Sequence, residues 1–108
     1  MNKFETELKA GNFVTSECSY CNRIVWPPSD YCDNCFKDVN WRKVSQIGKI
    51  IELSRKENDV FCITEFEDKI RVMGKLDAEI HMAKPGQTVR LSKCLLNDKN
   101  SFFFSLEN

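Results

Sequence analysis

The feature that most constrains this chain is a pair of C-x-x-C motifs near its N-terminus. Cys18-Ser-Tyr-Cys21 is followed, after ten residues, by Cys32-Asp-Asn-Cys35. Two intervening residues let both sulfurs of a pair face one point from a single tight turn, and the spacer brings the second turn opposite the first. The spacing therefore predicts a tetrahedral metal site of four thiolates. Structural zinc is the favoured ion and iron the less favoured one, since the same ligands accept both metals.

Other uses of paired cysteines fit this sequence less well. A redox C-x-x-C stands alone beside a βαβ pattern, which is absent from the sequence. Disulfides suit secreted domains, but the charged segment 1–8 is unlike a signal peptide. No apolar run approaches the roughly 20 residues that span a bilayer. We therefore expect a soluble, cytoplasmic protein whose thiols stay reduced and bind metal.

The pattern of residues around the motifs predicts a mainly β protein in three parts. Residues 1–12 form an N-terminal docking helix, in which Phe4 and Leu8 share a face and Gly11 caps the end. Residues 13–44 form the metal module, a zinc ribbon. Residues 45–108 read as a five-stranded OB-fold barrel. Its expected strands are 48–54, 60–66, 69–76, 88–96 and 101–106, with tight turns at 67–68 and 97–100.

The metal module has few candidates for a core of its own. Asn22 follows the first pair, at a position that favours a left-handed backbone. Aromatic residues are the simplest candidates to pack around the site: Trp26, Tyr31, Phe36 and Trp41. Pro27, Pro28 and Tyr31 lie at the tip of the spacer, where burial is harder to arrange. They are therefore candidates for an exposed contact surface.

The formal charge is balanced, with 16 Lys and Arg against 16 Asp and Glu. A nucleic-acid-binding protein usually carries a basic excess, so the balance lowers that class without removing it, because a local basic face fits within a neutral total. Zinc ribbons and OB folds do bind nucleic acids, so this function remains the alternative. Phe61 and Phe66 are the aromatic candidates, but two strand residues five apart cannot share a face.

Catalysis by this chain alone is not expected. A site of four thiolates has no open position for a catalytic water. His81 is the single histidine and lies in a connection. Cys62 and Cys94 lie in predicted strands and read as small core residues.

The order of these features resembles the acyl-CoA-associated OB-fold proteins with a rubredoxin-like zinc ribbon, a family described as a domain of unknown function. The resemblance covers essentially the whole chain. It is carried by Phe4, Leu8 and Gly11, the two C-x-x-C pairs, Pro27-Pro28, Trp41, Gly48, the hairpin 60–76 and Lys84-Pro-Gly-Gln-Thr-Val89. The chain departs from the family pattern at three places. Asn22 replaces a common Gly, Ser29 replaces a common Arg, and Asp33-Asn34 replaces a common Pro-containing pair.

The resemblance implies a non-catalytic scaffold subunit. Family members are similar to the subunit that holds acetoacetyl-CoA thiolase to 3-hydroxy-3-methylglutaryl-CoA synthase, in the mevalonate pathway, and that lines their shared pantetheine channel. The expected contacts to CoA or to the partner are Phe4, Leu8, Trp26, Pro27, Pro28 and Tyr31. Local packing of the metal module explains the spacer residues equally well.

Overall fold

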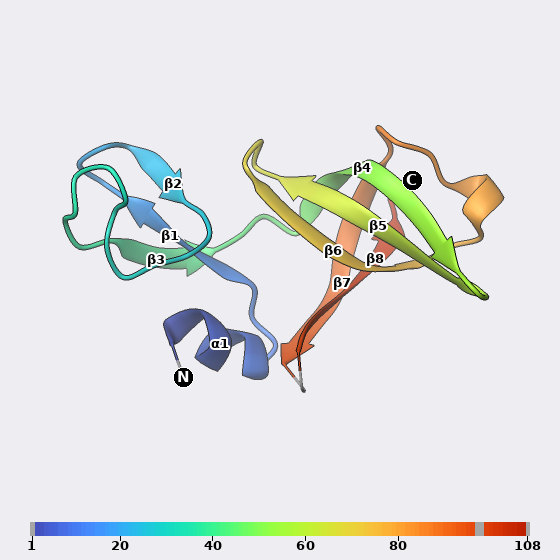
Figure 1. The fold of residues 1–108 in the computed structure, drawn as a ribbon, viewed down its shortest axis with the longest axis horizontal. Coiled ribbons are helices and arrows are strands. Elements are labelled where there is room, and N and C mark those ends of the chain that lie inside the picture. The colour runs from blue at the N-terminus through green and yellow to red at the C-terminus, as the bar shows by residue number, and fades with distance from the viewer. Residues whose placement is uncertain (1, 97–98, 108) are drawn as a thin grey trace.

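The computed structural model describes residues 2–96 and 99–107. The molecule is elongated, with extents of 45 × 28 × 21 Å. A small three-stranded sheet lies at one end, a barrel at the other, and the N-terminal helix lies beside the junction (Figure 1). The elements are α1 (Lys3–Lys9), β1 (Val14–Cys18), β2 (Arg23–Val25), β3 (Asn40–Lys43), β4 (Ile47–Lys56), β5 (Asp59–Phe66), β6 (Ile70–Asp77), η1 (Ile80–Met82), β7 (Thr88–Leu96) and β8 (Asn100–Leu106).

Helix α1 is short but has well-formed ends. The Asn2 side chain accepts a hydrogen bond from the Glu5 N–H at 2.8 Å, which satisfies one of the first free donors. At the other end, Gly11 adopts φ +88°, and the N–H groups of Gly11 and Asn12 donate to the carbonyls of Leu8 and Glu7. This is a Schellman motif, so Gly11 is the residue after the cap. The cap itself is Ala10, a correction of one residue to the prediction.

The metal module is an antiparallel sheet in the order β2-β1-β3. Strand β1 is central and ends at Cys18, so the chain enters the first cysteine turn directly from the sheet. Strand β3 carries the chain out of the module and into the barrel. The expected ribbon fold is therefore confirmed.

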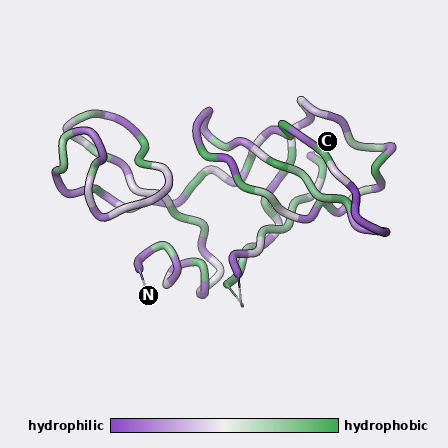
Figure 2. The backbone as a smooth tube through the Cα atoms, viewed as in Figure 1, coloured by the Kyte–Doolittle hydropathy of each residue, from purple (hydrophilic) through white to green (hydrophobic). Residues whose placement is uncertain are grey.

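The second part is a closed barrel in the order β4-β5-β6-β8-β7, as the five predicted strands indicated. Neighbouring strands of the barrel pair in antiparallel fashion, except that β6 and β8 run parallel to each other. Alternate residues of β5 are buried, as expected for a strand with one face toward the core. Hydrophobic and hydrophilic stretches are mixed along the barrel (Figure 2). Gly74 lets β6 approach β8, because a Cβ there would lie 2.5 Å from the Phe102 carbonyl oxygen.

One hydrophobic core joins all three segments. Phe13, just before β1, packs edge-on against Phe66 and Phe102 of the barrel, with ring centroids 5.5 and 5.0 Å away. The same ring lies 6.5 Å from Phe4 of α1 and 6.0 Å from Trp26. Each such aromatic pair contributes about 1 kcal/mol beyond its buried area. Helix, ribbon and barrel are therefore held in one arrangement.

Two of the expected packing residues lie elsewhere. Phe36 and Tyr31 are 77% and 58% exposed, so they do not pack around the cysteines. Trp26 and Trp41 are partly buried, but against the large core and not against the cysteine cluster. The cysteine turns are too small to cover large rings, whereas the junction with the barrel offers an apolar surface. The predicted turn at 97–100 lies partly outside the described residues.

Candidate metal centre and the adjoining groove

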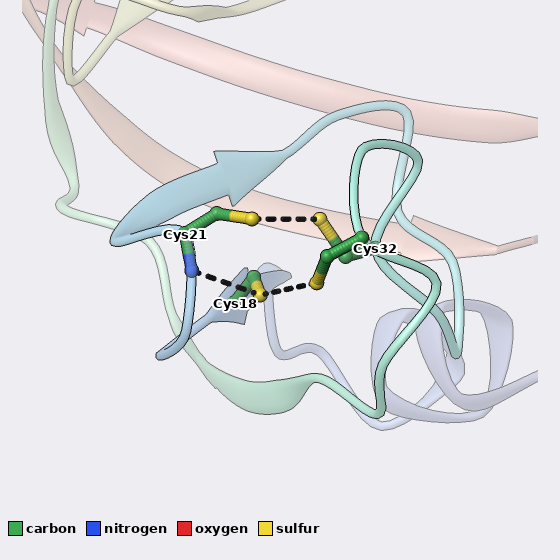
Figure 3. A group of neighbouring side chains, drawn as sticks. Cys18, Cys21 and Cys32 are labelled. Atoms are coloured by element: carbon green, nitrogen blue, oxygen red, sulfur yellow. Dashed lines mark hydrogen bonds between the residues drawn. The ribbon is translucent and has the colours of Figure 1, made fainter.

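The four motif cysteines meet at the far end of the ribbon. All four Sγ atoms lie within 4.8 Å of one another. Cys18 and Cys35 are 3.5 Å apart at sulfur, and Cys21 and Cys32 are 3.8 Å apart. Figure 3 shows the side chains of Cys18 and Cys21, from the first turn, pointing toward that of Cys32, from the second. Sulfurs bound tetrahedrally to zinc at about 2.3 Å would be about 3.8 Å apart, so the cluster could hold such an ion with little adjustment.

The backbone of the two turns positions the sulfurs. In the first turn the Cys21 N–H donates to Cys18 Sγ at 3.4 Å, and in the second the Asn34 N–H donates to Cys32 Sγ at the same distance. Asn22 has φ +54°, as the sequence predicted. The matching residue after the second pair is Phe36, at φ +62°. A bulky residue is uncommon in this conformation, which is why sequence reasoning did not identify it.

The thiols influence one another strongly. The backbone N–H of Cys35, together with that of Asn34, lowers the pKa of the Cys32 thiol to about 7. At Cys35 the Lys37 N–H favours the thiolate, but burial and the three neighbouring sulfurs raise the pKa to about 12. Four adjacent thiolates repel one another, so without a cation some must keep their protons. A divalent ion would remove this conflict, since it binds thiolates and displaces the protons.

A groove runs along the junction between ribbon and barrel. Its volume is about 640 Å³. The aromatic and proline side chains expected at a contact site line it together: Phe4 from α1, with Trp26, Pro27 and Pro28 from the spacer. Val72, Leu96 and Phe102 complete the wall from the barrel. The sequence offered no sign of these three, because it does not indicate which barrel strands face the ribbon.

A buried hydroxyl fixes the spacer that forms one side of the groove. Ser16 Oγ in β1 donates to the Val25 carbonyl at 3.1 Å and accepts from the Ser29 N–H, also at 3.1 Å. Ser16 is fully buried. It thus holds both ends of the segment that contains Pro27 and Pro28, and it places them against the barrel.

Two of the expected contact residues do not line the groove. Leu8 is fully buried in the chain's own core, so it offers no surface for CoA or a partner, and we no longer include it as a contact. Tyr31 is exposed near the second cysteine turn, where it forms an isolated bridge with Asp38. The structure therefore brings together Phe4, Trp26, Pro27 and Pro28.

The remaining chemically reactive side chains are dispersed. His81 is exposed on η1, with Nε2 3.2 Å from Glu79 Oε2. Cys62 and Cys94 are buried in the barrel, and burial raises the pKa of both thiols, which disfavours the reactive thiolate. Among the described helices, none is long and apolar enough to cross a membrane.

Comparison with solved structures identifies the fold. No protein-family model matches the chain, and no curated protein matches its sequence. A chain of the Ltp2-ChsH2(DUF35) aldolase superposes with a TM-score of 0.75 at 16% identity, over 98% of this chain and 96% of that one. This chain has the fold of DUF35 proteins. A DUF35 protein of unknown function from Sulfolobus solfataricus also matches, with a TM-score of 0.67 at 16% identity, over 97% and 83% of the two chains. The resemblance expected from the sequence is thus confirmed for the fold.

Proposed function

We propose that this chain is a non-catalytic bridging subunit that binds a thiolase-type acyl-CoA enzyme and lines a path for the pantetheine arm of the substrate. The partner that fits the family resemblance is acetoacetyl-CoA thiolase together with 3-hydroxy-3-methylglutaryl-CoA synthase. If both active sites open onto one path, the product of the first enzyme reaches the second enzyme without leaving the complex. This raises the effective concentration of that product at the second active site.

The observation that carries this proposal is the groove at the junction. Residues from three separate segments, Phe4, Pro28 and Val72 among them, converge on one largely apolar surface. A pantetheine arm is long, narrow and uncharged, so it needs such a groove and not a basic platform. Support also comes from the DUF35 protein that forms part of an aldolase with Ltp2.

We propose that Cys18, Cys21, Cys32 and Cys35 bind a structural zinc ion. A fourfold thiolate site has no vacant position, so the metal would fold the cysteine turns without taking part in chemistry. Its contribution to function would be indirect. It would fix the end of the ribbon from which the groove-lining spacer extends.

The alternative, nucleic-acid binding, receives less support. Phe66 is buried in the barrel core, so it is not available to stack on a base. Arg71 on the outer face is engaged by Glu65, with Nε 2.8 Å from Oε2. Glu65 therefore competes with a phosphate group for the Arg71 guanidinium.

Affinity purification of the tagged chain from its source, followed by identification of the bound proteins, tests the proposal. We expect a thiolase-type enzyme, with or without the synthase, in stoichiometric amount. Recovery of nucleic acid with salt-sensitive binding, and of no acyl-CoA enzyme, would support the alternative and contradict the proposal.

A further inference from the structure

We propose that Asn34 is a positioning residue of the metal centre, whose side chain joins the two cysteine turns and directs the Cys21 sulfur toward the ion. The inference rests on the proposed function in one respect, namely that the four cysteines bind a metal. It goes beyond that proposal because it assigns part of the affinity for the ion to a residue that is not itself a ligand.

Asn34 contacts one sulfur of each cysteine turn. Its backbone N–H donates to Cys32 Sγ at 3.4 Å, within its own turn. Its side-chain amide reaches the other turn, where Nδ2 lies 3.3 Å from Cys21 Sγ. The amide nitrogen donates hydrogen bonds and a thiolate accepts them, so this orientation suits a deprotonated Cys21. One residue therefore connects the two halves of the ligand set.

The Asn34 amide completes a set of N–H donors around the sulfurs. Three of the sulfurs accept hydrogen bonds from backbone N–H groups, which belong to Cys21, Asn34 and Lys37. The sulfur of Cys21 receives its donor from the Asn34 side chain. Four thiolates outweigh the charge of a divalent ion, and N–H groups that point at the sulfurs offset part of this excess. A substitution of Asn34 would therefore change the charge balance at one defined sulfur.

Another side-chain contact between the two turns is an exposed ion pair. Arg23 Nη2 lies 3.4 Å from Asp33 Oδ1, and the two side chains are 36% and 64% exposed, so the pair contributes little. Asn34 is exposed as well, and water can replace its hydrogen bond to Cys21. A water molecule would not, however, tie the second turn to the first. The Asn34 contact thus differs from the ion pair in ending on a metal-ligating atom.

The backbone does not account for an asparagine at position 34. Asparagine often marks a left-handed residue, as Asn22 does with φ +54°, but Asn34 is not among the residues with positive φ. The family pattern that this chain resembles commonly has a proline-containing pair at 33–34, and a proline side chain has no donor to offer. The side chain of Asn34 is therefore the feature that sets this turn apart.

The same contact closes the spacer that forms one side of the groove. Residues 22–31 run from the first cysteine turn to the second and include Pro27 and Pro28. Cys21 and Asn34 lie beyond the two ends of this segment, so their hydrogen bond holds the ends together. Sulfurs that are already gathered lose less freedom when the ion binds, which favours binding.

The zinc affinity of the full chain, measured by competition with a chromogenic chelator, tests the proposal. Asn34→Ala removes the amide but keeps the backbone donor to Cys32. We expect it to weaken zinc binding about tenfold, the lower end of the range for groups that orient metal ligands, because the position is exposed. Asn34→Asp keeps the size of the side chain but presents a carboxylate to the Cys21 thiolate, so it should weaken binding further.

Asp33→Asn is the matched control, because it alters the charge of the neighbouring exposed residue, whose carboxylate pairs with Arg23. It should bind zinc at least as tightly as the unaltered chain.

The absorption spectrum of the cobalt-loaded chain separates positioning of a ligand from general support of the turn. A hydrogen bond to a thiolate stabilises the electrons on sulfur, so charge transfer from sulfur to cobalt requires more energy. Loss of the amide in Asn34→Ala should therefore move the charge-transfer band to longer wavelength. The band of Asp33→Asn should stay in place.

The outcomes separate this inference from the proposed metal site. Equal zinc affinity of Asn34→Ala and the unaltered chain, or an unmoved charge-transfer band, overturns the role of Asn34 while the metal site stands. Normal affinity of Asn34→Asp also overturns it, since a position that needs only a turn-forming residue would accept aspartate. Failure of the unaltered chain to bind zinc or cobalt contradicts the metal site and this inference together.

Discussion

Arg42 of β3 holds Glu67, in the turn between β5 and β6, with two parallel hydrogen bonds of 3.0 and 2.8 Å. Its Nε also donates to Glu17 of β1 at 3.1 Å, and the Ser45 N–H donates to Glu67 at 3.0 Å. One guanidinium therefore connects two strands of the ribbon to a barrel turn. Together with Phe13, this contact sets how the ribbon sits on the barrel, and hence the shape of the groove.

Removing the charge of Glu67 should destabilise the protein modestly. Arg42 and Glu67 are partly exposed, at 34% and 23%, so solvent screening reduces the strength of the pair. We expect Glu67→Gln to lower the free energy of unfolding by about 1 kcal/mol, measured by urea denaturation. Glu107→Gln breaks a pair with Arg90 that is more exposed, and it should change stability by less than about 0.5 kcal/mol. Equal changes in the free energy of unfolding for the two variants would show that the Arg42–Glu67 contact stabilises the protein no more than an exposed ion pair does.

Stability should also depend on pH through the same residue. The hydrogen bonds from Arg42 lower the pKa of Glu67 from its ordinary value of 4.5, against the opposing effect of burial. A lowered folded-state pKa contributes stability above the unfolded value, and this contribution is lost as the pH falls through the folded value. We therefore expect the unfolding free energy to fall below about pH 4.5, and to fall less steeply in Glu67→Gln. Parallel pH profiles of the two proteins would contradict this assignment.

Removal of the metal should affect the cysteine turns first. We expect elemental analysis to give one zinc per chain, and Cys32→Ser or a strong chelator to abolish amide protection in residues 13–44. The barrel strands have their own closed hydrogen bonding and should stay protected, as expected if 13–44 and 45–108 are separate domains. Iron in place of zinc, or simultaneous loss of protection throughout the barrel, would contradict these two expectations respectively.

The Ser16 hydroxyl offers a test of how the groove is positioned. Ser16→Ala leaves the Ser29 N–H without its partner and should cost about 1–2 kcal/mol. Thr15→Val is the matched control, because the Thr15 hydroxyl makes only long contacts of 3.4 and 3.5 Å. Ser16→Ala should also weaken partner binding, since the spacer with Pro27 and Pro28 would lose its anchor. Equal stability and binding in both variants would mean that the spacer is held in another way.

Much of the fold could be predicted from local patterns. The C-x-x-C spacing defines the sulfur cluster, and Asn22 marks the left-handed residue after it. Alternating residues such as Ile70, Val72 and Leu76 identify a strand and its buried face. These features depend on neighbouring residues in the chain, which is the information that a sequence displays directly.

The groove could be predicted only in part. Phe4, Trp26, Pro27 and Pro28 were expected at a contact surface, but Leu8 was expected with them and is buried. Phe4 and Leu8 share the buried face of α1, but only Phe4 also lines the groove, because of where each end of the helix lies on the barrel, a long-range packing relationship. The barrel wall of the groove depends on strand order and register, which the sequence alone does not display.

The most direct test of the bridging role is complex formation between purified proteins, followed by light scattering. Val72→Glu places a carboxylate on the groove wall, and Ile51→Glu places one on β4 at a position that is already 36% exposed. We expect the unaltered chain and Ile51→Glu to form a stable complex with a thiolase-type enzyme, and Val72→Glu to weaken that complex about tenfold or more. Equal binding by both variants, or no complex with the unaltered chain, would contradict it.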